Sequence, residues 1–450
     1  MLQSGLALVG LSSILARVAA HQGCGGQEIA RRNLGMISGA AGFPQIQRRY
    51  VNNGSTDANA ECSYYTYQPA VDAKAQFPTI WEIAGLVSGD TEAETLFNQV
   101  VAQVNSTVPN IQVKGTPNGD FSSFTPTYNT SDPDCWWTYR QCDKPNRSGI
   151  PADVIDIPEP RSLGYGFDDG PNCSHNAFYE FLRENNQKAT MFYIGSNVMD
   201  WPLQAQDAIT DGHEICIHTW SHNYMTALTN EQAFAELYYT RKAIKLITGV
   251  TPMCWRPPFG DIDDRIRVIA GAMNLTSILW QEDSEDWRIN TGNPPVTAAS
   301  IDANYQALID SLNNGTFNER GTIMLTHELN NFTMSEAIKW YPQLKQAFAS
   351  LVPVASAYNL THPYQEGNIS YPDFGGNTVT SSSNSASATG SMTGIMTNGQ
   401  STGAATGAMT TGATTARAVQ TAANHSGSSV VSIPLAATVM AGMLAIYSCL

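Results

Sequence analysis

The chain has 450 residues, with 24 Lys and Arg against 39 Asp and Glu, so its formal net charge is −15. This acidic balance argues against nucleic acid as a partner, because binding phosphates needs clustered Lys and Arg. Hydrophobic residues make up 42% of the chain, enough for a sizeable core. Collagen, full-length disorder and a polytopic membrane protein are therefore excluded.

The N-terminal residues are typical of an exported protein. Residues 1–20 contain an apolar run from Leu6 to Ala16 and end in small residues, the pattern of a secretory signal peptide. Asn-x-Ser/Thr sequons support export and predict N-glycosylation. They lie at Asn53, Asn105, Asn129, Asn146, Asn172, Asn274, Asn314, Asn331, Asn359, Asn368 and Asn424.

The C-terminal residues predict a surface anchor. Residues 378–428 are mostly Ser, Thr, Ala, Gly and Asn, a composition that cannot bury a core and indicates an O-glycosylated stalk. An apolar tail follows at 430–450. Small residues, a polar spacer and such a tail indicate a GPI anchor at Asn424 or Ser426, with a C-terminal transmembrane helix as the alternative. We expect a secreted protein held at the plasma membrane or in the cell wall.

The eight cysteines suggest disulfides in an oxidising compartment. Cys449 lies in the tail, so the remaining number is odd and leaves one thiol free or paired between chains. Cys216 lies in a strand-like segment and is a candidate for an inert core thiol. Alternatively, cleavage after Arg48-Arg49 would remove Cys24. The others are Cys62, Cys135, Cys142, Cys173 and Cys254.

Residues 21–155 form an N-terminal region. We expect an amphipathic helix after Asp90, whose apolar face carries Leu96, Phe97, Val100, Val101 and Val104. Further on, Cys135 and Cys142 bracket Trp136-Trp137 and are expected to close a small loop. We expect the two indoles to be core residues rather than a platform for sugar rings.

From about residue 160, strand-like and helix-like segments alternate. The expected strands are 163–167, 189–194, 214–218, 276–280 and 322–325. Thr229 and Gln232 predict a capping box for a helix ending at Gly249. A second helix carries residues 301–312, and a third is expected to begin at Thr333 with Glu336 as box partner. This α/β alternation predicts a parallel sheet or barrel, whose chemistry lies at the carboxyl ends of the strands.

Acids and histidines follow those strands. The first strand ends in Asp168-Asp169, held by a Gly-Pro turn, and the third ends in His218-x-x-x-His222. Two imidazoles and the Asp169 carboxylate would leave an open position on a divalent metal, as in catalytic zinc sites. Later come Arg256 with its fixed guanidinium, an acidic segment at 283–286, and a histidine at 327 suited to general acid chemistry.

In this order, the five segments Asp168-Asp169, His218–His222, Arg256–Asp261, Asp283–Trp287 and Leu325–Glu328 resemble the polysaccharide deacetylases of the fourth carbohydrate esterase family. They are most similar to its GPI-anchored fungal members that act on chitin. The resemblance implies an α/β fold: a distorted or incomplete (β/α) barrel of the NodB-like type, with its catalytic domain at residues 156–360. It also implies N-deacetylation of chitin to chitosan and acetate.

The resemblance implies a role for each of the matching residues. Asp169, His218 and His222 would bind one divalent ion, zinc in preference to cobalt. Asp168 would be the general base, and Arg256 would tune it.

In the same way, His327 would be the general acid, oriented by Asp283 or Asp286. The backbone N–H of Phe259 would stabilise the oxyanion. Trp287 and Leu325 would shape the acetyl pocket.

Three residues depart from the usual family pattern: Gly166, Phe259 and Glu328, where Thr or Ser, Tyr and Asp are common. They put the substrate preference in doubt more than the activity. Two alternatives stay open at this point. One is a deacetylase of another acetylated glycan, such as xylan or a peptidoglycan-like polymer, and the other is a non-catalytic wall mannoprotein that binds glycan.

Overall fold

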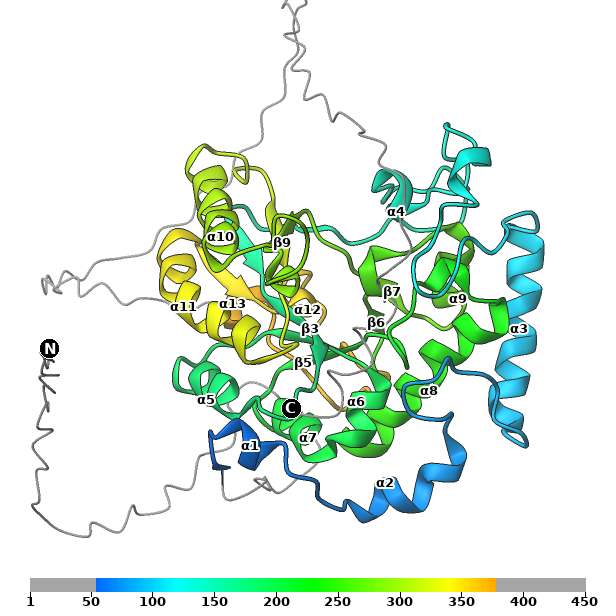
Figure 1. Ribbon diagram of the computed structural model, residues 1–450, viewed down its shortest axis with the longest axis horizontal. Helices are drawn as coiled ribbons and strands as arrows, with labels where there is room; N and C mark the ends of the chain where they lie inside the picture. Colours follow the sequence, from blue (N-terminus) through cyan, green and yellow to red (C-terminus); the bar gives the residue numbers. More distant parts are fainter. Residues whose placement is uncertain (1–53, 378–450) are drawn as a thin grey trace, which may run out of the picture. The chain divides into compact units, whose positions relative to one another are not determined.

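The structure is a computed structural model and describes residues 54–377 (Figure 1). The predicted signal peptide, Cys24, Asn53, the stalk, both anchor candidates (Asn424 and Ser426) and the apolar tail lie outside the described residues. Among residues 54–377, no helix is both long enough and apolar enough to cross a membrane.

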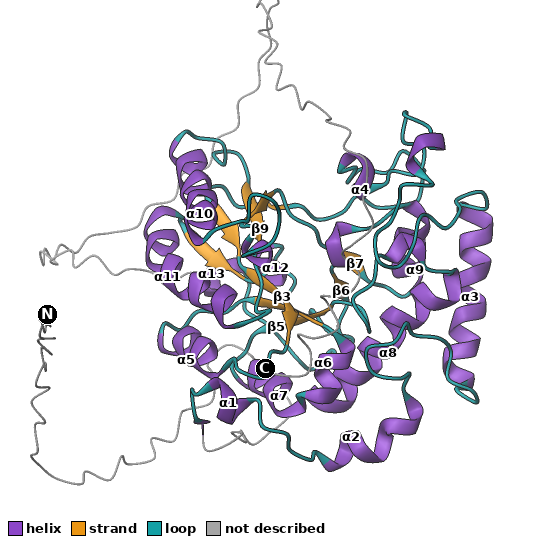
Figure 2. Cartoon of the chain, in the orientation of Figure 1, coloured by secondary structure: helices purple, strands orange, loops and turns teal. Residues whose placement is uncertain are grey.

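The described chain alternates strands and helices after a largely helical N-terminal part (Figure 2). The strands are β1 (Asp156–Ile157), β2 (Ser162–Gly164), β3 (Gly166–Gly170), β4 (Thr190–Tyr193), β5 (Glu214–Ile217), β6 (Cys254–Trp255), β7 (Thr276–Ser277), β8 (Glu282–Asp283), β9 (Gly321–Leu325) and β10 (Ser350–Val352). The α-helices are α1 (Ala58–Glu61), α2 (Gln68–Ala73), α3 (Thr91–Thr107), α4 (Trp137–Arg140), α5 (Asn176–Glu184), α6 (Gly195–Asp200), α7 (Pro202–Thr210), α8 (Asn230–Thr248), α9 (Asp264–Ala272), α10 (Ala298–Asn313), α11 (Asn331–Ala347), α12 (Val354–Ala357) and α13 (Phe374–Asn377).

Two sheets make up the α/β architecture. One is parallel, in the order β3-β4-β5-β6-β7, and the other has the order β1-β9-β2-β10, with β8 on the side of β9. A bridge between Asp168 and His327 joins β3 to the chain just after β9. The strands therefore follow one another around an incomplete (β/α) barrel, and this confirms the predicted fold class.

The core continues from the N-terminal region into the barrel. One cluster of buried apolar side chains includes Val100 and Val104 of α3 together with Phe234 and Ile244 of α8. The helix predicted after Asp90 is confirmed, and Asp90 caps it by accepting the N–H of Ala93. Residues 54–377 form a single compact unit.

Helix α8 is confirmed, with both bonds of its capping box and with Gly249 as its left-handed C-cap. The predicted start of α11 at Thr333 is wrong. Asn330 is the N-cap because its side-chain oxygen accepts the N–H groups of Phe332 and Thr333, which makes Thr333 the box partner. Asn is preferred over Thr at the N-cap position, so the helix begins three residues earlier than predicted.

The strand predicted at residues 163–167 is divided in two. β2 pairs with β9 and β10, whereas β3 pairs with β4, and Tyr165 lies between them. An apolar run that is buried on both sides of this break gives no sequence signal of it.

Three disulfides join the described cysteines: Cys62–Cys173, Cys135–Cys142 and Cys216–Cys254. The interpretation of Cys216 as an inert core thiol is wrong, because β5 and β6 are neighbours and bring Cys254 opposite it. The predicted small loop between Cys135 and Cys142 is confirmed. Trp136 and Trp137 inside it are both buried, as expected of core residues.

The described sequon asparagines are exposed, except for Asn172. Asn172 is half-buried, and its amide nitrogen donates to the carbonyl of Leu329 at 2.7 Å. A glycan on that nitrogen would compete with this contact, so Asn172 is the least suitable of the predicted acceptors.

Candidate active site

The side chains predicted to be functional meet where the strands end. Asp168 and Asp169 lie at the end of β3, His218 directly follows β5, Arg256 follows β6, and His327 comes two residues after β9. These four strands are buried along their lengths, and each predicted functional side chain lies at or beyond the last positions of its strand. The parallel arrangement therefore brings together residues that are far apart in the sequence.

Asp169, His218 and His222 form a cluster suited to a metal ion. Their nearest ligand atoms all lie within 4.8 Å of one another. Nε2 of His222 is 3.1 Å from Oδ1 of Asp169, and Nε2 of His218 is 3.4 Å from the same oxygen. On the other side of its ring, His218 Nδ1 lies 2.8 Å from the carbonyl of Arg256. Donation from Nδ1 to that carbonyl leaves Nε2 with a free lone pair.

The cluster fits a divalent cation by two further observations. Oδ1 of Asp169 is buried and has no hydrogen-bond donor. Burial raises the pKa of Asp169, but His222 and His218 outweigh this effect and hold it well below its ordinary range. A buried carboxylate that stays ionised, together with two imidazoles, is the ligand set of an open catalytic metal site.

Asp168, next to the metal ligands, is held by Arg256. Nη1 of Arg256 donates to Oδ1 of Asp168 at 2.6 Å, and both side chains are buried. The same guanidinium lies over the ring of Phe192, 3.9 Å from its centroid, and donates to the carbonyls of Ile278 and Leu279. Oδ2 of Asp168 therefore points to the cluster, 3.8 Å from Nε2 of His218.

His327 faces the same space from β9. Its Nδ1 lies 2.6 Å from Oδ1 of Asp286, whose Oδ2 accepts the backbone N–H of His327 at 3.0 Å. Burial alone would lower the pKa of His327. The negative charges of Asp286, Asp169 and Asp168 more than offset this effect and raise the pKa to about 10. The imidazole is thus protonated at neutral pH, the state that a general acid requires.

Asp283 does not make this contact. Its carboxylate accepts the N–H of Glu285 at 2.7 Å, and burial raises its pKa. Of the two acids predicted to orient His327, the structure brings Asp286 to its ring. The other predicted pocket residues differ in exposure: Leu325 is buried at the end of β9, whereas Trp287 and Phe259 are each 42% exposed.

The departures from the family pattern have local causes. A Cβ at Gly166 would lie 2.7 Å from the carbonyl oxygen of Thr190 on the neighbouring strand, which leaves no space for a side chain. Glu328 is fully buried, and its Oε1 accepts the hydroxyl of Tyr179 at 3.2 Å. It occupies the space that a side chain at Gly170 would need.

Sequence reasoning missed Glu236, a buried acid on α8. Its Oε2 accepts the N–H groups of Trp220 and Ser221 at 2.7 and 2.8 Å, and its Oε1 accepts the hydroxyl of Ser221. These contacts fix the turn between the two histidine ligands, where His222 has φ 56°. The sequence offers one signal of this role: Glu236 is an acid among Phe234, Leu237 and other apolar residues on the buried face of the helix.

Comparison with known proteins agrees with this geometry. Residues 156–278 match the family model described as polysaccharide deacetylase. Chitin deacetylase 2 of Cryptococcus neoformans var. grubii is 52% identical over 79% of this chain and 77% of its own length. Chitin deacetylase of Amylomyces rouxii is 44% identical over 72% of this chain and 75% of its own. The chain therefore belongs to the polysaccharide deacetylase family.

Among solved structures, peptidoglycan deacetylase PdaC from Bacillus subtilis matches 45% of this chain and 91% of its own. Its sequence identity is 27% and its TM-score 0.37. The chitin deacetylase of Colletotrichum lindemuthianum matches 46% of this chain and 91% of its own, with 20% identity and a TM-score of 0.41.

Proposed function

We propose that the chain removes N-acetyl groups from the N-acetylglucosamine units of chitin and releases chitosan and acetate. The observation that carries this proposal is the convergence of three groups at one end of the barrel. They are the Asp169, His218 and His222 cluster, the Asp168–Arg256 pair and the His327–Asp286 pair. The named activity of the relatives supports chitin as the substrate.

The residues of the cluster would hold a divalent ion. Zinc is favoured by two imidazoles and a carboxylate, and cobalt is the alternative. Such an ion supplies Lewis-acid chemistry, which polarises the acetyl carbonyl and makes water nucleophilic at neutral pH.

Asp168 is the base in this proposal. Its Oδ1 is occupied by Arg256, so Oδ2 is the oxygen that accepts the proton of the attacking water. The guanidinium holds the carboxylate in this direction. The N–H of Phe259 donates to the oxyanion that forms on the acetyl group, and a positioned donor of this kind contributes a few kcal/mol.

His327 completes the reaction by donating a proton to the amine of the leaving sugar. An amine departs poorly unless it is protonated, so the bond between carbon and nitrogen breaks as this proton is transferred. Asp286 holds the ring by Nδ1, which leaves Nε2 to face the substrate. Trp287 and Leu325 would surround the acetyl methyl group.

We further propose that the enzyme acts outside the cell, anchored through GPI at Asn424 or Ser426 to the plasma membrane or transferred to the wall. The sequons, the stalk composition and three disulfides among the described residues support an exported protein. Its partners would be chitin and other wall glycans. Anchoring is tested by release of the protein from cells with a phospholipase specific for this anchor.

The activity is tested with secreted protein spanning residues 21–420 and N-acetylglucosamine oligomers. We expect acetate release that stops on chelation and returns with added zinc or cobalt. Asp168→Asn and His327→Ala are each expected to lower kcat by at least about 100-fold. Each also leaves a buried charged partner unpaired and so lowers the melting temperature, and activity is therefore measured at a temperature at which thermal unfolding shows the variant to be folded. Glu184→Gln, at an exposed position at the end of α5, is the control for an acid with no role in the reaction.

Three results would contradict parts of the proposal. Release from acetylated xylan but not from chitin oligomers would keep the mechanism and replace the substrate. Full activity of Asp168→Asn would show that Asp168 is not the general base. If metal-loaded protein releases acetate from no acetylated glycan, the chain is a non-catalytic wall protein that binds glycan.

A further inference from the structure

Residues 114–138 precede the segment that matches the family model, yet they contact two loops of the candidate site. The loop of residues 219–226 follows β5 and carries His222, and the loop of residues 256–262 follows β6 and carries Phe259. The N–H of Lys114 donates to the carbonyl of Thr226 at 2.8 Å. The N–H of Trp137 donates to the carbonyl of Ile262 at 2.9 Å. The N-terminal region is therefore bonded directly to both loops.

The carboxylate of Asp261 joins these three segments. It is fully buried, and its Oδ1 accepts the indole N–H of Trp136 at 2.8 Å and the hydroxyl of Thr138 at 2.5 Å. Its Oδ2 accepts the N–H and the hydroxyl of Thr226 at 2.7 and 2.8 Å. Asp261 lies two residues after Phe259 in the same loop. Its carboxylate accepts the hydrogen bonds that link this loop to Trp136, to Thr138 and to Thr226 at the end of the His222 loop.

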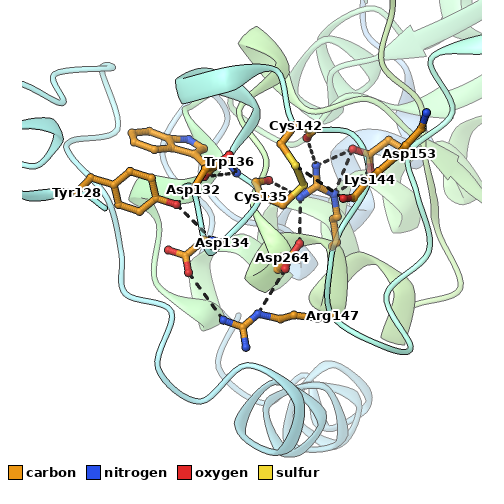
Figure 3. The surroundings of a disulfide bond; sticks show 11 residues. Tyr128, Asp132, Asp134, Cys135, Trp136, Cys142, Lys144, Arg147, Asp153 and Asp264 are labelled. Carbon is orange, nitrogen blue, oxygen red and sulfur yellow. Dashed lines mark hydrogen bonds and ion pairs between the residues drawn. A yellow bond between two sulfur atoms is a disulfide. The ribbon is translucent and has the colours of Figure 1, made fainter. Parts of the chain in front are cut away.

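Trp136 and Thr138 are presented by a rigid support. The Cys135–Cys142 disulfide closes residues 135–142, which we call the disulfide loop (Figure 3). Arg267 of α9 donates to the carbonyls of Cys135 and Cys142 at 2.6 and 2.7 Å. The carboxylate of Asp132 accepts the N–H of Trp136 at 3.0 Å. The disulfide loop is therefore held at both ends by contacts that do not involve Asp261.

The loop that it supports has an unusual backbone. Phe259 has φ 58° and ψ 10°, a left-handed backbone conformation that is uncommon for residues other than glycine and depends on support from the surroundings. Gly260 follows with φ 68°, and a Cβ there would lie 2.4 Å from the indole nitrogen of Trp137. The disulfide loop thus packs directly against the backbone that aims the N–H of Phe259.

We infer that Trp136 and Thr138 are positioning residues for the reaction. Acting through Asp261, they hold the N–H of Phe259 in the direction required by the acetyl oxyanion. This inference rests on the proposed role of Phe259. A donor fixed in advance acts mainly in the transition state, so its misalignment lowers kcat and leaves substrate binding nearly unchanged.

The test is the double variant Trp136→Phe/Thr138→Val, which keeps an aromatic ring at position 136 and nearly the same shape at position 138 but removes both donors to Asp261. With N-acetylglucosamine oligomers, we expect kcat to fall about 10- to 100-fold and KM to change less than about twofold. Bound metal is measured for each variant and is expected to equal that of the unchanged protein.

The matched control is Trp81→Phe. Trp81 also lies in the N-terminal region, and its indole N–H donates to Oδ2 of Asp200 at 3.1 Å, on α6. This variant loses the same kind of bond outside the two loops, so kcat should stay within about twofold of the unchanged protein. Thermal unfolding of both variants shows how much stability each variant loses.

The inference is overturned if the double variant keeps a kcat similar to that of Trp81→Phe. It is also overturned if KM rises at constant kcat, or if lost metal accounts for the lost activity. Asp168→Asn, measured in parallel, separates this inference from the proposed function. Retained activity in Asp168→Asn contradicts the site assignment, whereas its loss beside a fully active double variant contradicts the positioning role alone.

Discussion

The protonation of His327 depends on the carboxylates around its ring, because burial by itself favours the neutral imidazole. Burial lowers the pKa of this imidazole, and the charge of Asp286, 2.6 Å from Nδ1, is the largest influence that raises it, to about 10. A general acid is active only while it carries its proton. Activity should therefore be lost as the pH rises through the pKa of His327.

Asp286→Asn is expected to move that loss to lower pH. Without the negative charge, burial prevails and the pKa of His327 falls toward or below its ordinary value of 6.5. At pH 8, kcat/KM should drop about 10-fold or more, with a smaller loss at pH 5. The measurement is the pH profile of acetate release. An alkaline limb at the same pH in both proteins would show that Asp286 does not set this pKa.

Glu236 acts at the same scale, through the turn that carries His222. Glu236→Gln would replace one carboxylate oxygen with an N–H₂ that cannot accept, so backbone N–H groups on that side would lose their acceptor. We expect zinc affinity to fall about 10- to 100-fold, as for other residues that orient metal ligands. Competition with a chelator measures it, with exposed Glu231→Gln of the same helix as control. Equal affinities in the two variants would contradict the prediction.

These residues also show what the sequence could and could not predict. Asp169, His218 and His222 are recognisable because metal-ligating residue types follow buried strands at short spacing. Glu236 is not, because its role exists only once α8 packs its buried face beneath the histidine turn. Asp261 was visible within a motif, but two of its donors, Trp136 and Thr138, lie on the disulfide loop, more than a hundred positions earlier in the sequence.

At the scale of elements, the Cys216–Cys254 disulfide joins β5 to β6 beside the site. Each cysteine lies two residues before a functional side chain, His218 just after β5 and Arg256 just after β6. The ring of His218 in turn contacts the carbonyl of Arg256. The sequence indicated the strand at 214–218 but not β6, and the pairing of the two cysteines depends on the adjacency of these strands in the sheet.

Helices α1 and α5 meet through Glu61, whose Oε2 accepts the N–H of Asn176, the first residue of α5, at 2.8 Å. Burial raises the pKa of Glu61 from 4.5 to about 7. The folded protein therefore binds this proton more tightly than the unfolded chain. The resulting stabilisation is fully present below pH 4.5 and is lost as the pH rises to about 7.

Glu61→Gln removes this titration while keeping an oxygen for Asn176. Relative to the unchanged protein, the variant should gain in melting temperature between pH 5 and pH 8, because only the unchanged protein carries a buried charge at pH 8. Thermal unfolding at both values measures this difference, and exposed Glu94→Gln serves as the control. A difference in melting temperature that is the same at pH 5 and pH 8 would contradict the prediction.

At the scale of the described molecule, the N-terminal region and the barrel share one core. Phe97 of α3 packs on Phe234 of α8, with ring centroids 5.5 Å apart, and Lys242 of α8 pairs with Asp90 at the start of α3. The Cys62–Cys173 disulfide ties the region to the loop after β3. Removing residues 54–155 would therefore expose apolar surface of the barrel rather than release an independent domain.

This continuity predicts that α3 and α8 unfold together. Elements that share a cooperative core lose hydrogen-exchange protection with one free energy, whereas a separately folded region opens at a lower one. We expect the slowest amides of α3 and of α8 to report the same free energy of opening in the unreduced protein. Hydrogen exchange followed by mass spectrometry measures both helices at once. If α3 opens at a clearly lower free energy, the N-terminal region is a separate unit, and its contacts with the Phe259 loop would be expected to come and go as it opens.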